Sequence, residues 1–245
     1  MGSIIAIGGG SIDSGETLPI DREIVEEAGK DNPKALFLPT ASEDSSGYIE
    51  AFHKTYEDRL GCEVDVLELT KKNYTEEKIR EKINEADFVY VGGGNTKGMI
   101  EIWREKKVDK YLKQAYENGS VMSGLSAGAI CWFEYGHSDS ESYEKENNSG
   151  WNFIQVEGLN IVENVLFCPH YHQENREASF EEMLRDNPGL TGLAIDNNAA
   201  VKVEGDKLEI LKSRDEGTAY IAEVVDGEFK LRELAEGEKY PLEKL

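Results

Sequence analysis

A serine in a glycine-rich turn is the residue of this sequence whose surroundings most clearly suggest chemistry. Ser126 lies in the sequence G-L-S-A-G at positions 124–128, between a short strand-like segment and residues 127–132, which can begin a helix. A sharp strand-to-helix turn exposes a serine hydroxyl, and small neighbours let a substrate carbonyl approach. The N–H groups at the helix start suit a developing oxyanion. The pattern therefore predicts a nucleophile, and the alternative is an incidental serine in a glycine-rich turn.

A serine nucleophile needs a base within hydrogen-bond reach, and the sequence offers four histidines. We choose His170 because it follows a predicted strand and stands beside Pro169, which restrains the local backbone. His172 would face the other way in an extended segment. His53 is expected on a helix surface and His137 in a polar loop. The alternative for His170 is a structural histidine at a strand end.

The acid that would orient the base has three candidates. Asp139 and Glu141 lie in the polar segment between Ser126 and His170. Asp196 ends a predicted strand at 193–195 and would lie at the edge of the same crevice. Because the chain is rich in acidic residues, the alternative for each of the three is a solvated surface residue, which is the more common role.

The oxyanion needs two hydrogen-bond donors, which we expect from the backbone. The Ala127 N–H follows the nucleophile directly, and an N–H from Gly93 or Gly94 would complete the pair. A tight glycine turn without a catalytic role is the alternative for the second segment. We expect no metal, because His170 and His172 lack partners at a recognisable spacing, and no cofactor. The glycines at 8–10 do not form a dinucleotide-binding G-x-G-x-x-G.

Alternating strands and helices must position these residues. Buried strands are predicted at 4–7, 34–39, 87–91 and before Ser126, and a strand of alternating apolar and acidic residues at 63–69. Helices are predicted at 20–28, 46–60, 75–86, 97–105 and 108–118. Such uniformly apolar strands predict a mostly parallel sheet with helices on both faces, an α/β fold. Ligands bind beyond the carboxyl ends of such strands. Residues 92–96 and Ser126 are therefore expected to face one crevice.

The second half of the chain has a less regular pattern. Residues 133–155 are polar and are interpreted as one long loop, followed by a strand at 158–167, a helix at 175–185 and a strand pair at 193–201. Turns at 204–206 and 226–228 separate short β segments from Val201 onward. These segments predict a C-terminal antiparallel β extension, so that residues 1–245 form one domain.

The composition excludes several classes of function. With 27 basic and 49 acidic residues the net charge is −22, which disfavours nucleic acid or an anionic membrane as partner. Three cysteines without a disulfide spacing favour a reducing cytosol. The first residues form a strand pattern rather than a signal peptide, and no apolar run is long enough to span a bilayer. We therefore expect a cytoplasmic protein.

Taken together, five motifs resemble the peptidase E family of serine peptidases, the aspartyl dipeptidases, to which cyanophycinase is related. They are V-G-G-G-N-T at 91–96, G-L-S-A-G-A at 124–129, P-H-Y at 169–171, N-R-E at 175–177 and G-L-A-I-D-N at 192–197. The resemblance implies a fold like class I glutamine amidotransferases. It also implies Ser126 as nucleophile, His170 as base, and an acid in the region of Asp139 and Glu141, with Asp196 as the alternative. An arginine that recognises an aspartyl carboxylate corresponds to Arg176.

We therefore predict a serine exopeptidase that cleaves small peptides after an N-terminal aspartate through a Ser-His-acid triad. Asn95, Thr96 and Arg176 are the predicted substrate-binding residues. A cyanophycinase-like hydrolase of β-aspartyl-arginine bonds and a non-catalytic ligand-binding member of the same fold are the alternatives. An α/β-hydrolase esterase would place its histidine nearer the C-terminus. The expected partner is a small peptide, and both a monomer and a homodimer stay open.

Overall fold

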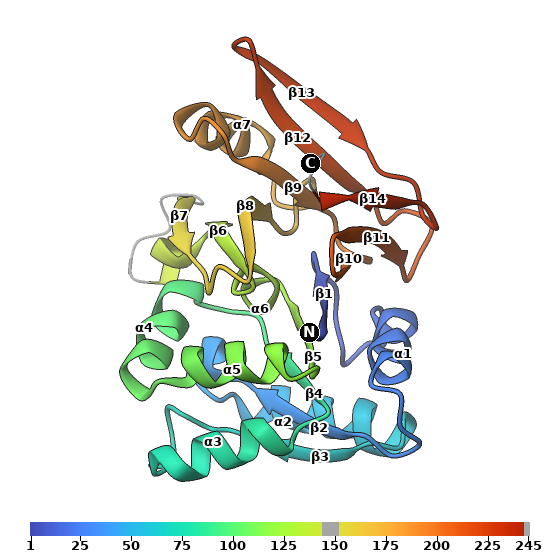
Figure 1. The fold of residues 1–245 in the computed structure, drawn as a ribbon, viewed down its shortest axis with the longest axis vertical. Coiled ribbons are helices and arrows are strands. Elements are labelled where there is room, and N and C mark those ends of the chain that lie inside the picture. Colours follow the sequence, from blue (N-terminus) through green and yellow to red (C-terminus); the bar gives the residue numbers. More distant parts are fainter. Residues whose placement is uncertain (144–151, 243–245) are drawn as a thin grey trace.

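Two sheets organise the described part of the chain, residues 1–143 and 152–242 of a computed structural model (Figure 1). The first sheet has the strand order β14-β11-β10-β1-β5-β4-β2-β3. Its parallel half contains β1 (Ser3–Ile7), β2 (Lys34–Leu38), β3 (Glu63–Val66), β4 (Phe88–Val91) and β5 (Val121–Leu125). β10 (Ala199–Glu204), β11 (Lys207–Lys212) and β14 (Lys239–Pro241) extend it antiparallel from β1.

Helices cover both faces of the parallel half, as the sequence predicts. On one face α1 (Leu18–Glu27), α2 (Ser46–Phe52) and its π-helical continuation η2 (His53–Arg59) bury Ile20, Phe52 and Tyr56 against the sheet. On the other face lie α3 (Glu76–Glu85), α4 (Thr96–Lys106) and α5 (Val108–Glu117), which pack against alternate residues of the same strands. Strands buried on both sides explain the uniformly apolar runs.

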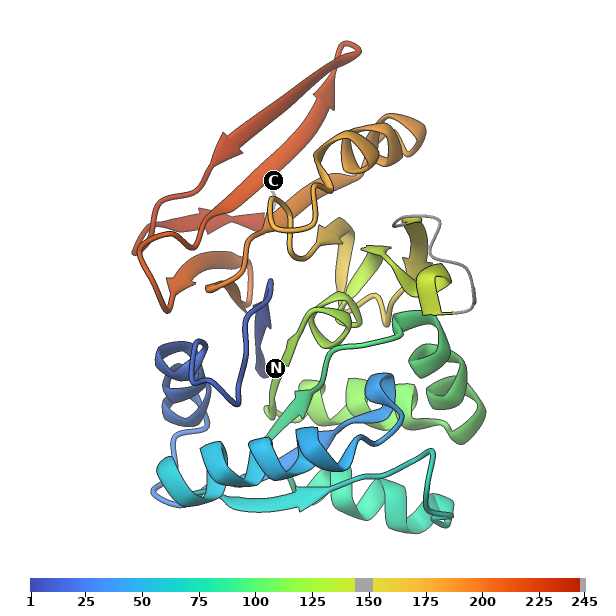
Figure 2. The same ribbon diagram turned by 180° about the vertical axis from the view of Figure 1, so that it is seen from behind.

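The second sheet has the order β13-β12-β9-β8-β6-β7. It contains β6 (Phe133–Ser138), β7 (Ile154–Glu157), β8 (Val162–Cys168), β9 (Thr191–Ile195), β12 (Ala219–Val225) and β13 (Glu228–Glu233). The short α6 (Ala127–Ile130) contacts strands of both sheets, and α7 (Glu177–Asp186) packs Phe180 and Leu184 against the second. Seen from behind, the β12–β13 hairpin extends away from the rest of the chain (Figure 2).

The long loop expected at 133–155 is wrong at both ends. β6 and β7 pair in this segment, and residues 144–151 lie outside the described residues. The polar residues of β6 made this strand look like a loop in the sequence. His137 and Ser138 are nevertheless buried, because they bond to Ser179 and Thr96, which lie far away in the chain. The antiparallel C-terminal extension is confirmed, although its strands divide between the two sheets. Within the described residues, no helix is long and apolar enough to cross a membrane.

Candidate active site

Ser126 lies in a tight turn between β5 and α6, as the sequence predicts. Its backbone angles are φ 56° and ψ −112°, a conformation rare for a residue other than glycine. The Ser126 N–H donates to the carbonyl of Ile7, at 3.0 Å, so that the end of β1 holds the turn. Ser126 is partly exposed, whereas residues 121–125 and 127–133 are buried. The turn therefore leaves the serine accessible within a buried segment.

His170 is fixed to the same end of β1. Its N–H donates to the carbonyl of Gly8 at 3.2 Å, one residue after the carbonyl that holds Ser126. Gly9 lies under the ring, because a Cβ there would be 2.2 Å from His170 Nδ1 and 2.0 Å from Asn197 Oδ1. The carbonyls of two successive residues, Ile7 and Gly8, therefore accept the backbone N–H groups of the predicted nucleophile and base. This contact gives the glycines at 8–10 a structural role.

Asn197 is the residue that sequence reasoning missed. Its side-chain Oδ1 is 2.6 Å from Nδ1 of His170. If Nδ1 carries the hydrogen and donates to this oxygen, Nε2 keeps its lone pair, which is the tautomer a general base needs. The backbone N–H of Asn197 donates to Oε1 of Gln173, at 2.9 Å, which ties the β9–β10 turn to the His170 loop. Its place directly after Asp196, at a strand end, is the signal that could have found it.

The surroundings of His170 favour a neutral imidazole. Burial lowers the pKa of His170 below its ordinary value, the Glu174 carboxylate opposes that change, and Arg176 adds to it. A histidine with a lowered pKa is unprotonated at neutral pH and can accept a proton.

The three candidate acids lie in different surroundings. Asp196 is buried, and its carboxylate accepts hydrogen bonds from the N–H and Nδ1 of His172, both at 3.0 Å. Asp139 lies 3.9 Å from Arg176, and burial raises the pKa of its carboxyl group. Glu141 accepts a hydrogen bond from the side-chain amide of Asn152. Which of them completes a triad stays a prediction.

The expected oxyanion donors lie beside the nucleophile. Ala127 is the first residue of α6, so its N–H has no acceptor within that helix. A Cβ on Gly93 would lie 3.4 Å from Cβ of Ser126, which places Gly93 against the serine. Its N–H donates to the Tyr48 hydroxyl at 3.4 Å. Gly94 follows with φ 137°.

The two polar residues after Gly94 take part in the start of α4. Asn95 is the N-cap of the helix, and its Oδ1 accepts from the Gly98 N–H at 3.0 Å. The Thr96 hydroxyl is buried and accepts from Ser138, at 3.1 Å. These contacts join α4 to β6. Binding of substrate by Asn95 and Thr96 stays a prediction.

Comparison with known proteins now places the chain in a family. A model described as peptidase family S51 matches residues 4–211. The chain belongs to this family. Over 243 residues it is 33% identical to a protein named uncharacterized peptidase YgaJ, from Bacillus subtilis strain 168, covering 98% of this chain and 99% of that protein. It is 26% identical to a peptidase E from Nostoc sp., over 79% of this chain and 78% of the other.

A solved structure shows the same fold. The crystal structure of a peptidase from an acI-B1 Actinobacterium superposes with a TM-score of 0.73, at 20% identity, over 98% of this chain and 97% of that chain. The resemblance to peptidase E is thus confirmed, and the S51 chain is a hydrolase of the peptidase type.

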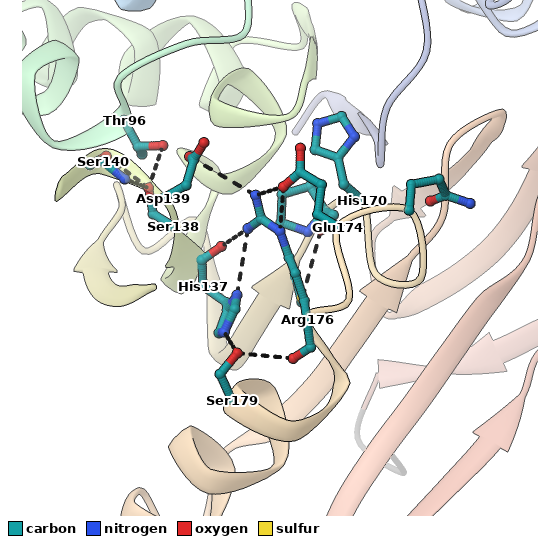
Figure 3. A network of polar contacts seen from close by, with 12 residues as sticks. Thr96, His137, Ser138, Asp139, Ser140, His170, Glu174, Arg176 and Ser179 are labelled. Atoms are coloured by element: carbon teal, nitrogen blue, oxygen red, sulfur yellow. Dashed lines mark hydrogen bonds and ion pairs between the residues drawn. The ribbon is translucent and has the colours of Figure 1, made fainter. Parts of the chain in front are cut away.

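In this peptidase the guanidinium of Arg176 lies in a buried polar network (Figure 3). Arg176 is 1% exposed. Its Nε and Nη2 donate to one oxygen of Glu174 at 2.9 and 2.5 Å, and Nη1 donates to the carbonyl of His137 at 2.6 Å. The ring of Phe153 lies 4.6 Å from the guanidinium carbon. Substrate recognition by Arg176 stays a prediction, and a carboxylate, Glu174, already binds it.

The same network fixes His137, the histidine that we expected in a polar loop. It is fully buried in β6, and its Nε2 lies 2.9 Å from the Ser179 hydroxyl. Burial, with the Arg176 charge, lowers the pKa of His137 to about 3. The ring is therefore neutral at physiological pH and joins β6 to α7. The site thus combines an accessible serine, a neutral histidine and a buried arginine–carboxylate pair.

Proposed function

We propose that the chain is a serine peptidase in which Ser126 attacks the scissile carbonyl and His170 is the general base. The observation that carries the proposal is that adjacent carbonyls at the end of β1 and just after it, those of Ile7 and Gly8, accept the backbone N–H groups of Ser126 and His170. His170 takes the serine proton as the Oγ–C bond forms, and returns it to the leaving amine as the peptide C–N bond breaks. Water then hydrolyses the acyl-enzyme by the same route.

We propose short peptides with an N-terminal aspartate as substrates. A desolvated carboxylate needs a cation, and the buried guanidinium of Arg176 is a cation with the required planar geometry. Glu174 pairs with this guanidinium, and 21% of the Glu174 side chain is exposed. An aspartyl carboxylate would take its place on the guanidinium, and the displaced Glu174 carboxylate would turn to solvent.

Replacement of the serine tests the reaction. Ser126→Ala should lower kcat by on the order of 10⁴–10⁶ and leave the melting temperature close to that of the wild type, because the side chain is small and partly exposed. Hydrolysis is measured on dipeptides with N-terminal aspartate, with N-terminal alanine and with a β-aspartyl-arginine bond. A purified variant that retains a tenth of the wild-type activity would contradict the role of Ser126.

The pair Arg176→Ala and Glu174→Gln tests the choice of substrate. Removing the guanidinium should cost aspartyl peptides about 2–5 kcal/mol in kcat/KM, the range for truncating one partner of a buried charge pair. Glu174→Gln removes the competing carboxylate and should lower KM for aspartyl peptides only. Equal losses for aspartyl and alanyl peptides would mean that Arg176 supports the fold. Preferential cleavage of β-aspartyl-arginine would favour the cyanophycinase-like reaction.

A further inference from the structure

The Tyr48 side chain reaches Gly93, the glycine that packs against Ser126, from a distant part of the chain. It lies in α2, on the opposite side of the sheet from α4 and α5. A Cβ on Gly92 would be 2.9 Å from its ring, so the absence of a side chain there seats the tyrosine. The Phe37 ring lies edge-on to it, at 5.1 Å between centroids. Two neighbours therefore fix the direction of the phenol.

The Tyr48 hydroxyl lies at the turn that flanks Ser126. It accepts the N–H of Gly93, the residue packed against the Ser126 side chain. Among the described residues this is the hydrogen bond that the hydroxyl makes, which leaves its own hydrogen without an acceptor. Burial raises the pKa of Tyr48 to about 12, so that the phenol keeps its hydrogen at neutral pH. A protonated hydroxyl with a free hydrogen is an available donor.

We propose that the Tyr48 hydroxyl is a catalytic oxyanion donor that acts together with the Ala127 N–H. This inference rests on the proposed serine peptidase reaction. The Gly93 N–H, which with that of Gly94 was a candidate for the second oxyanion donor, donates to a lone pair of the phenol. In this proposal that bond leaves the hydroxyl hydrogen free to point toward the substrate carbonyl. The donor then stabilises the charge that develops on the carbonyl oxygen as Ser126 attacks, in a site whose dipoles need no reorganisation.

The variant Tyr48→Phe tests the proposal, because it keeps the ring and removes only the hydroxyl. We expect kcat to fall by about 10²–10³, the loss for one oxyanion donor, with KM within about twofold of the wild type. Tyr90→Phe is the matched control. Tyr90 belongs to the same aromatic cluster on β4, but its buried hydroxyl has no hydrogen-bond partner in the described structure. Its kcat and KM should stay within about twofold of the wild type.

A peptide aldehyde gives a readout that a packing role would not change. The aldehyde forms a tetrahedral adduct with the serine and places an oxygen in the oxyanion site. The inhibition constant of the aldehyde should rise in Tyr48→Phe by a factor similar to the loss in kcat/KM. The inhibition constant of the product amino acid should not change. A Tyr48→Phe enzyme that keeps more than half of the wild-type kcat would overturn the inference. If Ser126→Ala stays active, the proposed function itself fails.

Discussion

Two histidines of one loop, His170 and His172, differ in their surroundings, and His170 is the one that we propose as the base. Adjacent residues of the β9–β10 turn hold them. Asn197 lies 2.6 Å from Nδ1 of His170, and Asp196 lies 3.0 Å from Nδ1 of His172. His172 is the more exposed ring, with 42% of its side chain accessible, whereas His170 lies half-buried over Gly9.

The difference concerns the charge of the partner. The half-buried ring is held by a neutral amide oxygen, and the exposed ring is held by a carboxylate. A carboxylate favours the protonated imidazole, whereas an amide fixes the ring with a weaker effect on its charge. Among the carboxylates, Glu174 acts most strongly on the charge of His170, and Arg176 opposes it. These surroundings favour a neutral and oriented His170, which its proposed role as a base requires.

The comparison predicts opposite outcomes for the two histidines. His170→Gln should lower kcat by on the order of 10⁴, because the serine loses its proton acceptor. His172→Gln should leave kcat within about threefold of the wild type, because the ring lies at the surface. The two variants are assayed on the same peptide series. Equal losses would show that the two rings do not differ in role.

Asn197 is the next largest expected effect. Asn197→Ala removes the acceptor at Nδ1, so the ring can rotate and adopt the other tautomer. We expect a loss of about 10²-fold in kcat, comparable to misplacing a catalytic group by about 1 Å. Asn198→Ala serves as the neighbouring control. Wild-type kcat in Asn197→Ala would mean that another residue orients His170.

A carboxylate in place of this amide should change the pH dependence. In the wild type, the acid limb of kcat/KM should lie below about pH 6.5, the ordinary pKa of histidine, because burial lowers the pKa of His170. Asn197→Asp favours the protonated ring and raises that pKa, so the acid limb should move to higher pH. Profiles of the two enzymes are compared between pH 4 and 8. An unchanged limb would argue against His170 as the titrating base.

Asp196 gives the smallest expected effect on activity. Asp196→Asn keeps an oxygen for the His172 N–H and loses the charge, so kcat/KM should stay within about threefold. The free energy of unfolding should fall by about 1–2 kcal/mol, because a hydrogen bond to a charged buried group is weakened. Urea denaturation measures this change. A loss of activity as large as that of Asn197→Ala would instead support Asp196 as the orienting acid.

The sequence by itself predicts features that depend on residues close together in the chain, such as turns, helix caps and buried strands. The turn at Ser126 follows from small residues between a strand and a helix start. Thr75 caps α3, because its hydroxyl accepts the Lys78 N–H three residues on. Apolar runs with helices between them predict a parallel sheet covered on both faces. A strand with one face in water would carry polar residues at every second position, and these strands do not.

Tertiary structure decided the rest, because the deciding contacts join residues far apart in sequence. β6 was hidden since Thr96, Arg176 and Ser179 supply the partners that let its polar residues be buried. Pairing of Asn197 with His170, and of Asp196 with His172, depends on the side to which each residue of one turn points. Tyr48 reaches Gly93 across 45 positions, which no local pattern records. The sequence leaves several residues as equivalent candidate partners for these side chains. The packing of the folded chain determines which of them make contact.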